Sequence, residues 1–236
     1  ALMGGHDVVG FARHSDTRNM RRIEDYRISP RFRLVFGDLT GDISGLLEGV
    51  DAVVNFAART FVDQSILDPE PFIQSNIVGT YKLLEQARKY KPKRYVQVST
   101  DEVYGAILEG SYKEDARLNP TNPYSSTKAA ADMLCVSYWN TYHLPIIITR
   151  TENNYGPWQH PQKAMPVFVQ KALRNEKLPV YGDGKHRRMW LHVEDHCQAV
   201  LHILEKGEPG EIYHVAGEEE LENVELARRI LDILGK

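Results

Sequence analysis

The chain has 236 residues, 29 of them basic and 32 acidic, with a formal net charge of −3, which suits one large or two small domains with a sizeable core. The balanced charge argues against nucleic acid or an anionic membrane surface as a partner, and no apolar run approaches the ~20 residues of a membrane span. Two cysteines are too few for a disulfide framework or a cysteine metal site, so we expect a cytoplasmic protein without a metal.

The first residues read as the end of a helix. Residues 1–6 carry a Gly-Gly stop, and residues 7–13 follow as an expected strand. A doubly wound dinucleotide fold normally opens with a strand and a Gly-x-x-Gly-x-x-Gly turn, whose backbone amides hold the pyrophosphate. The sequence has no such turn at this point, so we expect a fragment or truncated product that begins inside the first helix.

Strand and helix patterns then alternate up to Arg150. Helices are expected at residues 71–90 and 124–142, and strands at residues 33–36, 51–56, 94–98 and 145–149. The first helix has an apolar stripe at helical spacing, which core packing or a dimer face would explain: Ile73, Ile77, Tyr81, Leu84 and Ala87. The alternation predicts an α/β fold in which residues 1–150 form a Rossmann-like domain with a doubly wound parallel sheet.

Residues 151–236 have a mixed pattern. Helices are expected at residues 164–174, 194–204 and 222–234, and strands at residues 178–181, 190–193 and 211–216. We expect a smaller mixed α/β lobe that caps the sheet edge and is truncated at its C-terminus.

The stretch from residue 95 to residue 128 carries the strongest chemical signal. An apolar run at residues 95–98 stops at Ser-Thr-Asp-Glu, as a buried parallel strand does when it delivers side chains to the carboxyl edge of a sheet, where ligands bind. Tyr124 and Lys128 then lie one turn apart on the same face of a helix. A nearby ammonium favours phenolate, so Tyr124 can act as a base. A helix cap and a chance Tyr-x-x-x-Lys are the alternative interpretations.

Together these features resemble the extended short-chain dehydrogenase/reductase family, and within it the dTDP-glucose 4,6-dehydratases. Thr-Asp-Glu at the strand end is the discriminating signal, since sugar-nucleotide epimerases usually carry other residues in place of the acidic pair. The resemblance covers nearly the whole chain, and its most specific segments are residues 98–105, 153–157, 178–184 and 190–196.

The resemblance implies a lyase that converts an NDP-hexose, above all dTDP-glucose, to the 4-keto-6-deoxy sugar, a reaction of deoxysugar biosynthesis. Tyr124 is expected to take the proton of the 4-hydroxyl, with Lys128 lowering its pKa and holding the nicotinamide ribose. Thr100 would hydrogen-bond the 4-oxygen, Glu102 would remove the C5 proton, and Asp101 would protonate the C6 hydroxyl. Two neighbouring carboxylates with opposite roles must titrate apart. The alternative for this pair is an exposed acidic turn.

The resemblance also implies binding residues, although ordinary loop or surface use is the alternative for each. The substrate would contact Asn153, Lys163, Pro179, Tyr181, Arg188 and Asn223. The cofactor would contact Arg13, Asp38, Leu39, Phe56, Ala57 and Ala58, besides Tyr124 and Lys128.

Two departures leave the ligands open. Arg13, with Arg18, stands near the position where NAD-preferring members carry an acid, so NADP is suggested, as in GDP-mannose 4,6-dehydratases, whose corresponding stretch is also basic. Simple surface charge would equally explain Arg13. Met189 follows Arg188 where an aspartate is usual, which leaves the nucleobase undecided.

We therefore predict a sugar-nucleotide 4,6-dehydratase that uses NAD or NADP and forms a homodimer through residues 71–90 and 124–142. One alternative is an NDP-sugar 4-epimerase or decarboxylase of the same family. Another is a non-catalytic sugar-nucleotide-binding protein that lacks the cofactor loop.

Overall fold

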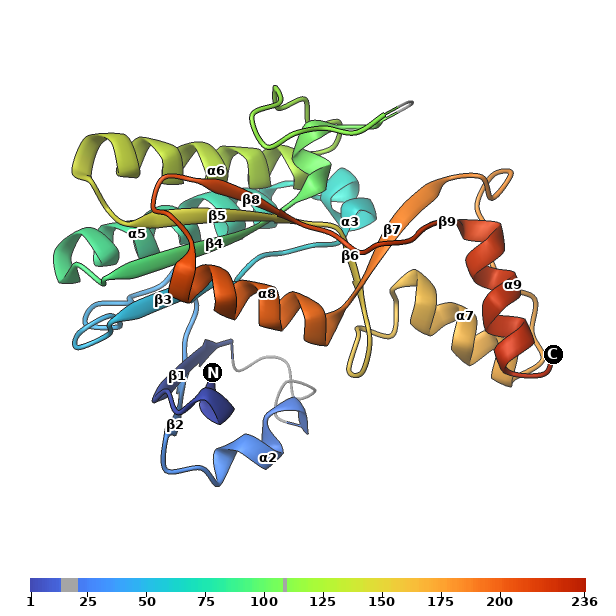
Figure 1. Ribbon diagram of the computed structural model, residues 1–236, viewed down its shortest axis with the longest axis horizontal. Coiled ribbons are helices and arrows are strands. Elements are labelled where there is room, and N and C mark those ends of the chain that lie inside the picture. The colour runs from blue at the N-terminus through green and yellow to red at the C-terminus, as the bar shows by residue number, and fades with distance from the viewer. Residues whose placement is uncertain (14–20, 108–109) are drawn as a thin grey trace. The chain divides into compact units, whose positions relative to one another are not determined.

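The computed structural model describes residues 1–13, 21–107 and 110–236 (Figure 1). The chain divides into two compact units. The first unit comprises residues 1–150 and 200–213, and the second comprises residues 151–199 and 214–236. The assignment of a dinucleotide-binding domain and a sugar-nucleotide-binding lobe stays a prediction.

The strands that lie wholly or mainly in the first unit, together with β8, form two separate sheets. One is the parallel pair β1 (Val8–Ala12) and β2 (Phe32–Phe36). The other has the order β3-β4-β5-β8, with strands β3 (Ala52–Asn55), β4 (Arg94–Thr100), β5 (Ile146–Thr151) and β8 (Ile212–Val215). In the doubly wound order 3-2-1-4-5-6, β2 and β1 correspond to strands 3 and 2, and β3 to strand 4. No described strand corresponds to strand 1, which accounts for the separate ladders. The predicted α/β class with parallel strands is confirmed.

The chain enters β1 through a short 3₁₀ helix, η1 (Leu2–Gly4). Gly5 ends it with φ 87°, a left-handed conformation that glycine adopts without strain, and its N–H bonds to the Leu2 carbonyl. The predicted helix end with a glycine stop is therefore present. A short helix before β2, α2 (Glu24–Arg27), was not predicted.

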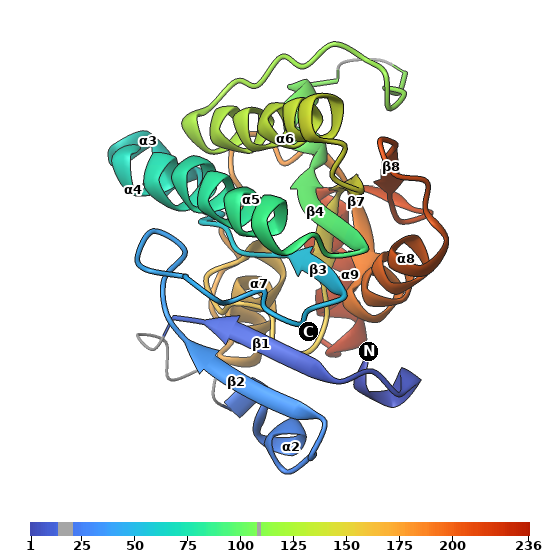
Figure 2. The same ribbon diagram turned by 90° about the vertical axis from the view of Figure 1, so that its left-hand side faces the viewer.

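Helices α5 (Gly79–Tyr90) and α6 (Pro123–Tyr142) lie side by side in the first unit (Figures 1 and 2). They pack on the sheet through a buried core that includes Leu83, Leu84, Ala87, Tyr95, Cys135 and Ile146. Shorter helices precede α5, namely α3 (Val62–Leu67), α4 (Glu70–Phe72) and the π-helix η2 (Ile73–Val78).

The apolar stripe expected at residues 71–90 is only partly buried, so core packing explains some of its members and the dimer-face alternative stays a prediction for the others. Leu84 and Ala87 are buried, but Ile73 and Tyr81 are 44% and 46% exposed. The reason is η2: its i→i+5 bonding changes the number of residues per turn, so a 3.6-residue spacing does not continue across it.

The second unit contains strand β7 (Arg187–His192), which pairs parallel with β6 (Asn153–Tyr155) and antiparallel with β9 (Glu220–Glu222). Helix α7 (Ala164–Leu173) and helix α9 (Asn223–Ile233) share a core of Phe168, Leu221, Leu226, Ala227 and Ile230. Helix α8 (Val193–Lys206) follows β7 directly.

The strand predicted at residues 178–181 is wrong. These residues are irregular and lead into a turn at residues 182–184. Pro179 has no N–H for a ladder, and Gly182 and Gly184 have φ values of 59° and 73°, which strands do not use.

Candidate active site

The end of β4 presents the predicted Thr-Asp-Glu group on a short 3₁₀ helix, η3 (Asp101–Tyr104). Thr100 is the N-cap of η3, and its Oγ1 accepts a hydrogen bond from the Glu102 N–H at 3.3 Å. The same hydroxyl donates to Asp101 Oδ1 at 3.1 Å. Thr100 is buried, and both acidic residues are half-buried. Thr100 therefore does cap a helix, and this does not conflict with a chemical role for the same group. Asp101 and Glu102 do not form an exposed acidic turn.

The N-terminus of α6 is joined to this turn by Asn122, which sequence reasoning missed. Asn122 Oδ1 accepts from the Ser125 N–H at 2.9 Å, and its own N–H donates to Ser125 Oγ at 3.2 Å, which completes a capping box. Its side-chain amide donates to Glu102 Oε2 at 3.3 Å. Asn-Pro before a helical pattern is a recognisable N-cap signal, but the contact with Glu102 depends on the fold.

Tyr124 and Lys128 are buried on α6, at 7% and 4% exposure. Burial raises the pKa of Tyr124 above its ordinary value, the Glu102 charge raises it further, and hydrogen bonding with Thr100 opposes both effects. Burial lowers the pKa of Lys128, while the Asp132 carboxylate opposes that shift. The Lys128 ammonium donates to the Val98 carbonyl at 2.7 Å, so in this structure it binds the β4 backbone.

Predicted cofactor residues follow the ends of β1, β2 and β3. Asp38 Oδ1 accepts from the Thr40 N–H at 2.9 Å and from its hydroxyl at 2.8 Å. The backbone bond from Thr40 is the largest cause of the lowered pKa of Asp38, and the charges of Arg13 and Arg59 contribute. Arg13 is exposed, whereas the predicted partner Arg18 lies outside the described residues.

The segment after β3 offers an apolar surface. Phe56 is 54% exposed, Ala57 is exposed and Ala58 is half-buried. Leu39 is 7% exposed and packs in the core, so its side chain is not presented to a ligand. The exposed apolar groups after β3 can lie against the flat rings of a dinucleotide. The Asp38 carboxylate after β2 and the Arg13 guanidinium after β1 can bind its ribose or phosphate groups, so these residues fit a nicotinamide cofactor.

The predicted substrate residues all lie in the second unit. Asn153 is half-buried on β6, Lys163 is the N-cap residue of α7, and Asn223 opens α9. Tyr181 is 80% exposed, and Pro179 is exposed in the same irregular segment.

Arg188 is exposed on β7, as a ligand-binding guanidinium would be. Its Nη1 donates to the Arg187 carbonyl at 3.0 Å. The neighbouring Arg187 instead pairs with Glu220 at 3.1 Å and Glu222 at 3.6 Å. The resemblance singled out Arg188, and adjacent side chains of a strand point to opposite faces, so the two arginines are not equivalent.

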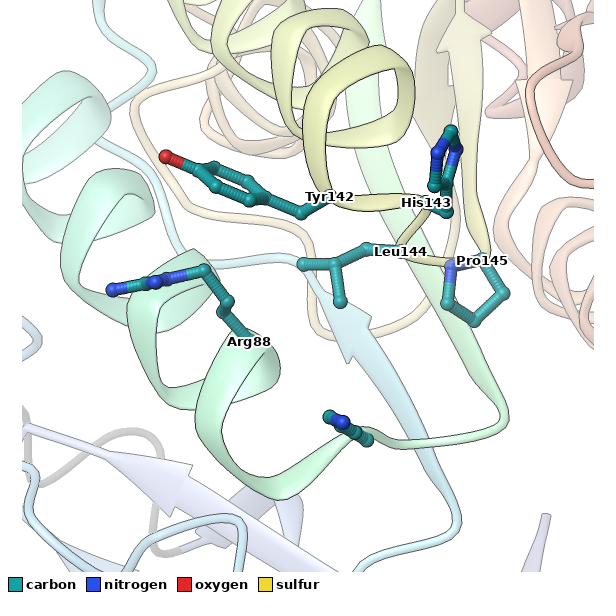
Figure 3. Close-up of a pocket in the computed structure, with 6 residues that line it drawn as sticks. Arg88, Tyr142, His143, Leu144 and Pro145 are labelled. Atoms are coloured by element: carbon teal, nitrogen blue, oxygen red, sulfur yellow. The ribbon is translucent and has the colours of Figure 1, made fainter.

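A pocket lies before the start of β5, whereas the Thr-Asp-Glu group begins at the end of the neighbouring strand β4. Figure 3 shows the side chains that line it. It is bounded by the last turns of α5 and α6 and by the residues just before β5, namely Arg88, Lys91, Tyr142, His143, Leu144 and Pro145. None of the predicted site residues lines it.

Across residues 1–13, 21–107 and 110–236, no three His, Cys, Asp or Glu side chains are grouped so that they could hold a metal ion. In the same described part of the chain, every helix is too short or too polar to cross a membrane.

The family model described as GDP-mannose 4,6 dehydratase matches residues 1–233. The chain is 47% identical over 212 residues to the low-salt glycan biosynthesis protein Agl12 of Haloferax volcanii, covering 89% of this chain and 68% of that protein. It is 43% identical over 219 residues to dTDP-glucose 4,6-dehydratase of Streptomyces niveus, covering 92% of this chain and 64% of that protein. The chain thus spans about two thirds of the length of these curated relatives.

Solved structures match the fold over almost the whole chain. A dTDP-glucose 4,6-dehydratase of Streptomyces venezuelae, the DesIV double mutant with NAD and DAU bound, has a TM-score of 0.93 and 41% identity, covering 99% of this chain and 76% of that one. UDP-glucuronic acid 4-epimerase of Bacillus cereus, in complex with UDP-glucuronic acid and NAD, has a TM-score of 0.94 and 29% identity, with coverages of 99% and 76%.

Proposed function

This chain belongs to the family described as GDP-mannose 4,6 dehydratase, and we propose that it acts as a sugar-nucleotide 4,6-dehydratase on dTDP-glucose. One observation carries the proposal: the strand-end turn with Thr100, Asp101 and Glu102 is hydrogen-bonded to the helix that carries Tyr124 and Lys128. The relatives described as dTDP-glucose 4,6-dehydratases support the choice of substrate.

Removing water from a hexose requires an acidified C5 proton and an assisted leaving group. A nicotinamide dinucleotide, when bound, supplies the hydride acceptor at C4 and the hydride that returns to C6. Tyr124 takes the proton of the 4-hydroxyl, and Thr100 hydrogen-bonds the 4-oxygen. The C4 carbonyl acidifies the C5 proton, which Glu102 removes, while Asp101 protonates the departing C6 hydroxyl. Glu102 would return its proton to C5 when the hydride is added at C6, and the proton taken by Tyr124 would replace the one given up by Asp101, so that one water leaves and a 4-keto-6-deoxy sugar remains.

Tyr124 needs assistance to act as a base, because its burial raises its pKa. Lys128 is the group that we propose for this task, since a cation beside a phenol favours the phenolate. The proposal therefore requires the Lys128 side chain to change its conformation, so that its ammonium leaves the Val98 carbonyl and approaches Tyr124 and the nicotinamide ribose. The same group would hold the nicotinamide ribose.

The remaining cofactor contacts that we propose come from the ends of β1 to β3. Asp38 and the backbone of Leu39 would contact the adenosine, and Phe56, Ala57 and Ala58 would form the floor along which the dinucleotide lies. The exposure of Phe56 and Ala57 supports this assignment.

We infer that Arg13 favours NADP, because an exposed guanidinium can bind a 2′-phosphate. Replacing Arg13 by Ala should lower the ratio of NADP to NAD affinity by about tenfold, as expected for the loss of one charge-assisted hydrogen bond. Isothermal titration with each dinucleotide would measure the ratio, and Arg33→Ala, which removes an exposed arginine from β2, is the matched control. An unchanged ratio in Arg13→Ala would assign the arginine to the surface.

In the second unit, we propose that Arg188 and Lys163 bind the diphosphate and that Pro179 and Tyr181 bind the nucleobase. A guanidinium pairs well with phosphate, and an exposed aromatic ring can stack on a base. Asn153 and Asn223 would contact the sugar nucleotide.

The first test of the function is Glu102→Gln in the protein that carries this chain. Its carboxamide cannot accept the C5 proton, so exchange of that proton with solvent deuterium should fall at least about a hundredfold, within the usual share of a general base. C4 oxidation should continue. Mass spectrometry of the recovered sugar nucleotide measures the exchange, and persistent exchange in the variant would remove Glu102 from its role.

A 4-epimerase is the second candidate, favoured by the fold shared with a UDP-glucuronic acid 4-epimerase. The two reactions differ in composition. A dehydratase product is lighter than its substrate by one water, whereas an epimerase product has the same mass. Proton NMR of the product would separate them, because only the dehydratase product has a C6 methyl group.

We further propose a homodimer formed through the face of η2, α5 and α6, on which Ile73, Tyr81, Met133 and Tyr142 are exposed. Large apolar side chains exposed on neighbouring helices are a feature of surfaces that bind other proteins. The cytoplasmic location stays a prediction from the sequence.

A further inference from the structure

A buried ion pair lies next to the candidate active site. Arg150, at the end of β5, donates from Nε to Asp132 Oδ2 at 3.1 Å, and the two side chains are 2% and 0% exposed. Burial raises the pKa of Asp132, and the charges of Arg150 and Lys128 oppose that shift. Taking two charges out of water is costly, and such pairs contribute little to stability unless further bonds complete them. The other bonds of Arg150 therefore indicate what the pair does.

Those bonds lead to the turn that carries the acidic residues. Arg150 Nη1 donates to Tyr104 Oη at 2.5 Å and to the Glu114 carbonyl at 3.1 Å. Tyr104 Oη also donates to the Glu114 carbonyl at 3.2 Å, and the guanidinium lies 4.8 Å from the Tyr104 ring centroid. Tyr104 is the last residue of η3. Arg150 thus holds the far end of η3, as Asn122 holds the Glu102 side chain.

The other partner of Arg150 belongs to the helix of the proposed base. Asp132 lies one turn beyond Lys128 and two turns beyond Tyr124 on α6. Arg150 therefore connects α6, through Asp132, with η3, through Tyr104.

We propose that Arg150, held by Asp132, is a positioning residue that fixes η3 relative to α6 during the dehydration. The proposal rests on the proposed function. It assigns a selective role: Tyr124 and Thr100, used in C4 oxidation, lie on α6 and β4, whereas Asp101 and Glu102, used in elimination, lie on η3. Loosening η3 should therefore slow elimination and leave oxidation intact.

Tyr104→Phe tests this with the least disturbance. It removes only the Oη bonds, while the ring, the Arg150–Asp132 pair and the core around Val103 and Ala129 are retained. Exchange of the C5 proton and water loss should slow by about ten- to a hundredfold, since misplacement by about 1 Å can cost a hundredfold. The rate of C4 oxidation in a single turnover, and the KM for the sugar nucleotide, should stay within about twofold of the wild type. Arg150→Lys keeps a positive charge beside Asp132 but loses the forked guanidinium that bonds Asp132 and Tyr104 together. It should likewise slow elimination and leave C4 oxidation unchanged.

Tyr112→Phe is the matched control, because its ring lies 5.3 Å from that of Tyr104 and it undergoes the same chemical change. Its rates should equal those of the wild type. A readout without substrate is amide hydrogen exchange of residues 101–105 in the purified protein, which should be faster in Tyr104→Phe and unchanged in Tyr112→Phe.

The outcomes separate the two proposals. Equal slowing of oxidation and exchange in Tyr104→Phe, or no change in rates and amide exchange, overturns the positioning role. If the wild type removes no water from any sugar nucleotide, the proposed function fails, and the amide exchange result still decides whether Arg150 fixes η3.

Discussion

At the scale of single residues, two polar caps also orient the proposed catalytic groups. Thr100 caps η3 and hydrogen-bonds Asp101, and Asn122 caps α6 and hydrogen-bonds Glu102. Asn122→Asp separates the two tasks of Asn122, since aspartate caps a helix as well as asparagine does but donates no amide and repels the Glu102 carboxylate. We expect the free energy of unfolding to stay within about 0.5 kcal/mol of the wild-type value. The rate of C5 proton exchange should fall roughly ten- to a hundredfold.

Thermal unfolding and deuterium incorporation measure these two effects. Asn122→Ser is the control, because serine also caps the helix and brings no charge; it should lose less exchange activity than Asn122→Asp. Wild-type exchange in Asn122→Asp would show that the contact with Glu102 has no part in catalysis.

At the scale of elements, alternation and local signals predicted most of the first unit. Expected strands and helices lie within one or two residues of β1 to β5 and α6, because apolar periodicity reflects burial directly. The π-helix η2 was not predictable, since no local composition marks a change in residues per turn. The irregular segment at residues 178–181 was mistaken for a strand because a short apolar run resembles one, although Pro179 counts against it.

The same limit applies to the candidate site. Thr100, Asp101, Glu102, Tyr124 and Lys128 were found from strand-end and helix spacing. The contacts of Glu102 with Asn122 and of Arg150 with Tyr104 join residues 20 and 46 positions apart, so only the fold brings them together. The roles of these residues stay predictions.

At the scale of the whole molecule, the question is whether two copies associate through the helical face. Tyr81 on α5 is 46% exposed, on the face that we propose for the dimer. Tyr81→Glu would place a charge in an apolar contact, and burying an unpaired carboxylate is strongly unfavourable. Light scattering at a fixed protein concentration should give twice the monomer mass for the wild type and the monomer mass for this variant.

Tyr26→Glu makes the same change at 49% exposure on α2, away from that face, and should stay dimeric. A Tyr81→Glu variant with the mass of the wild type would exclude this face as the interface, because the added charge would then not lie in a contact between two copies.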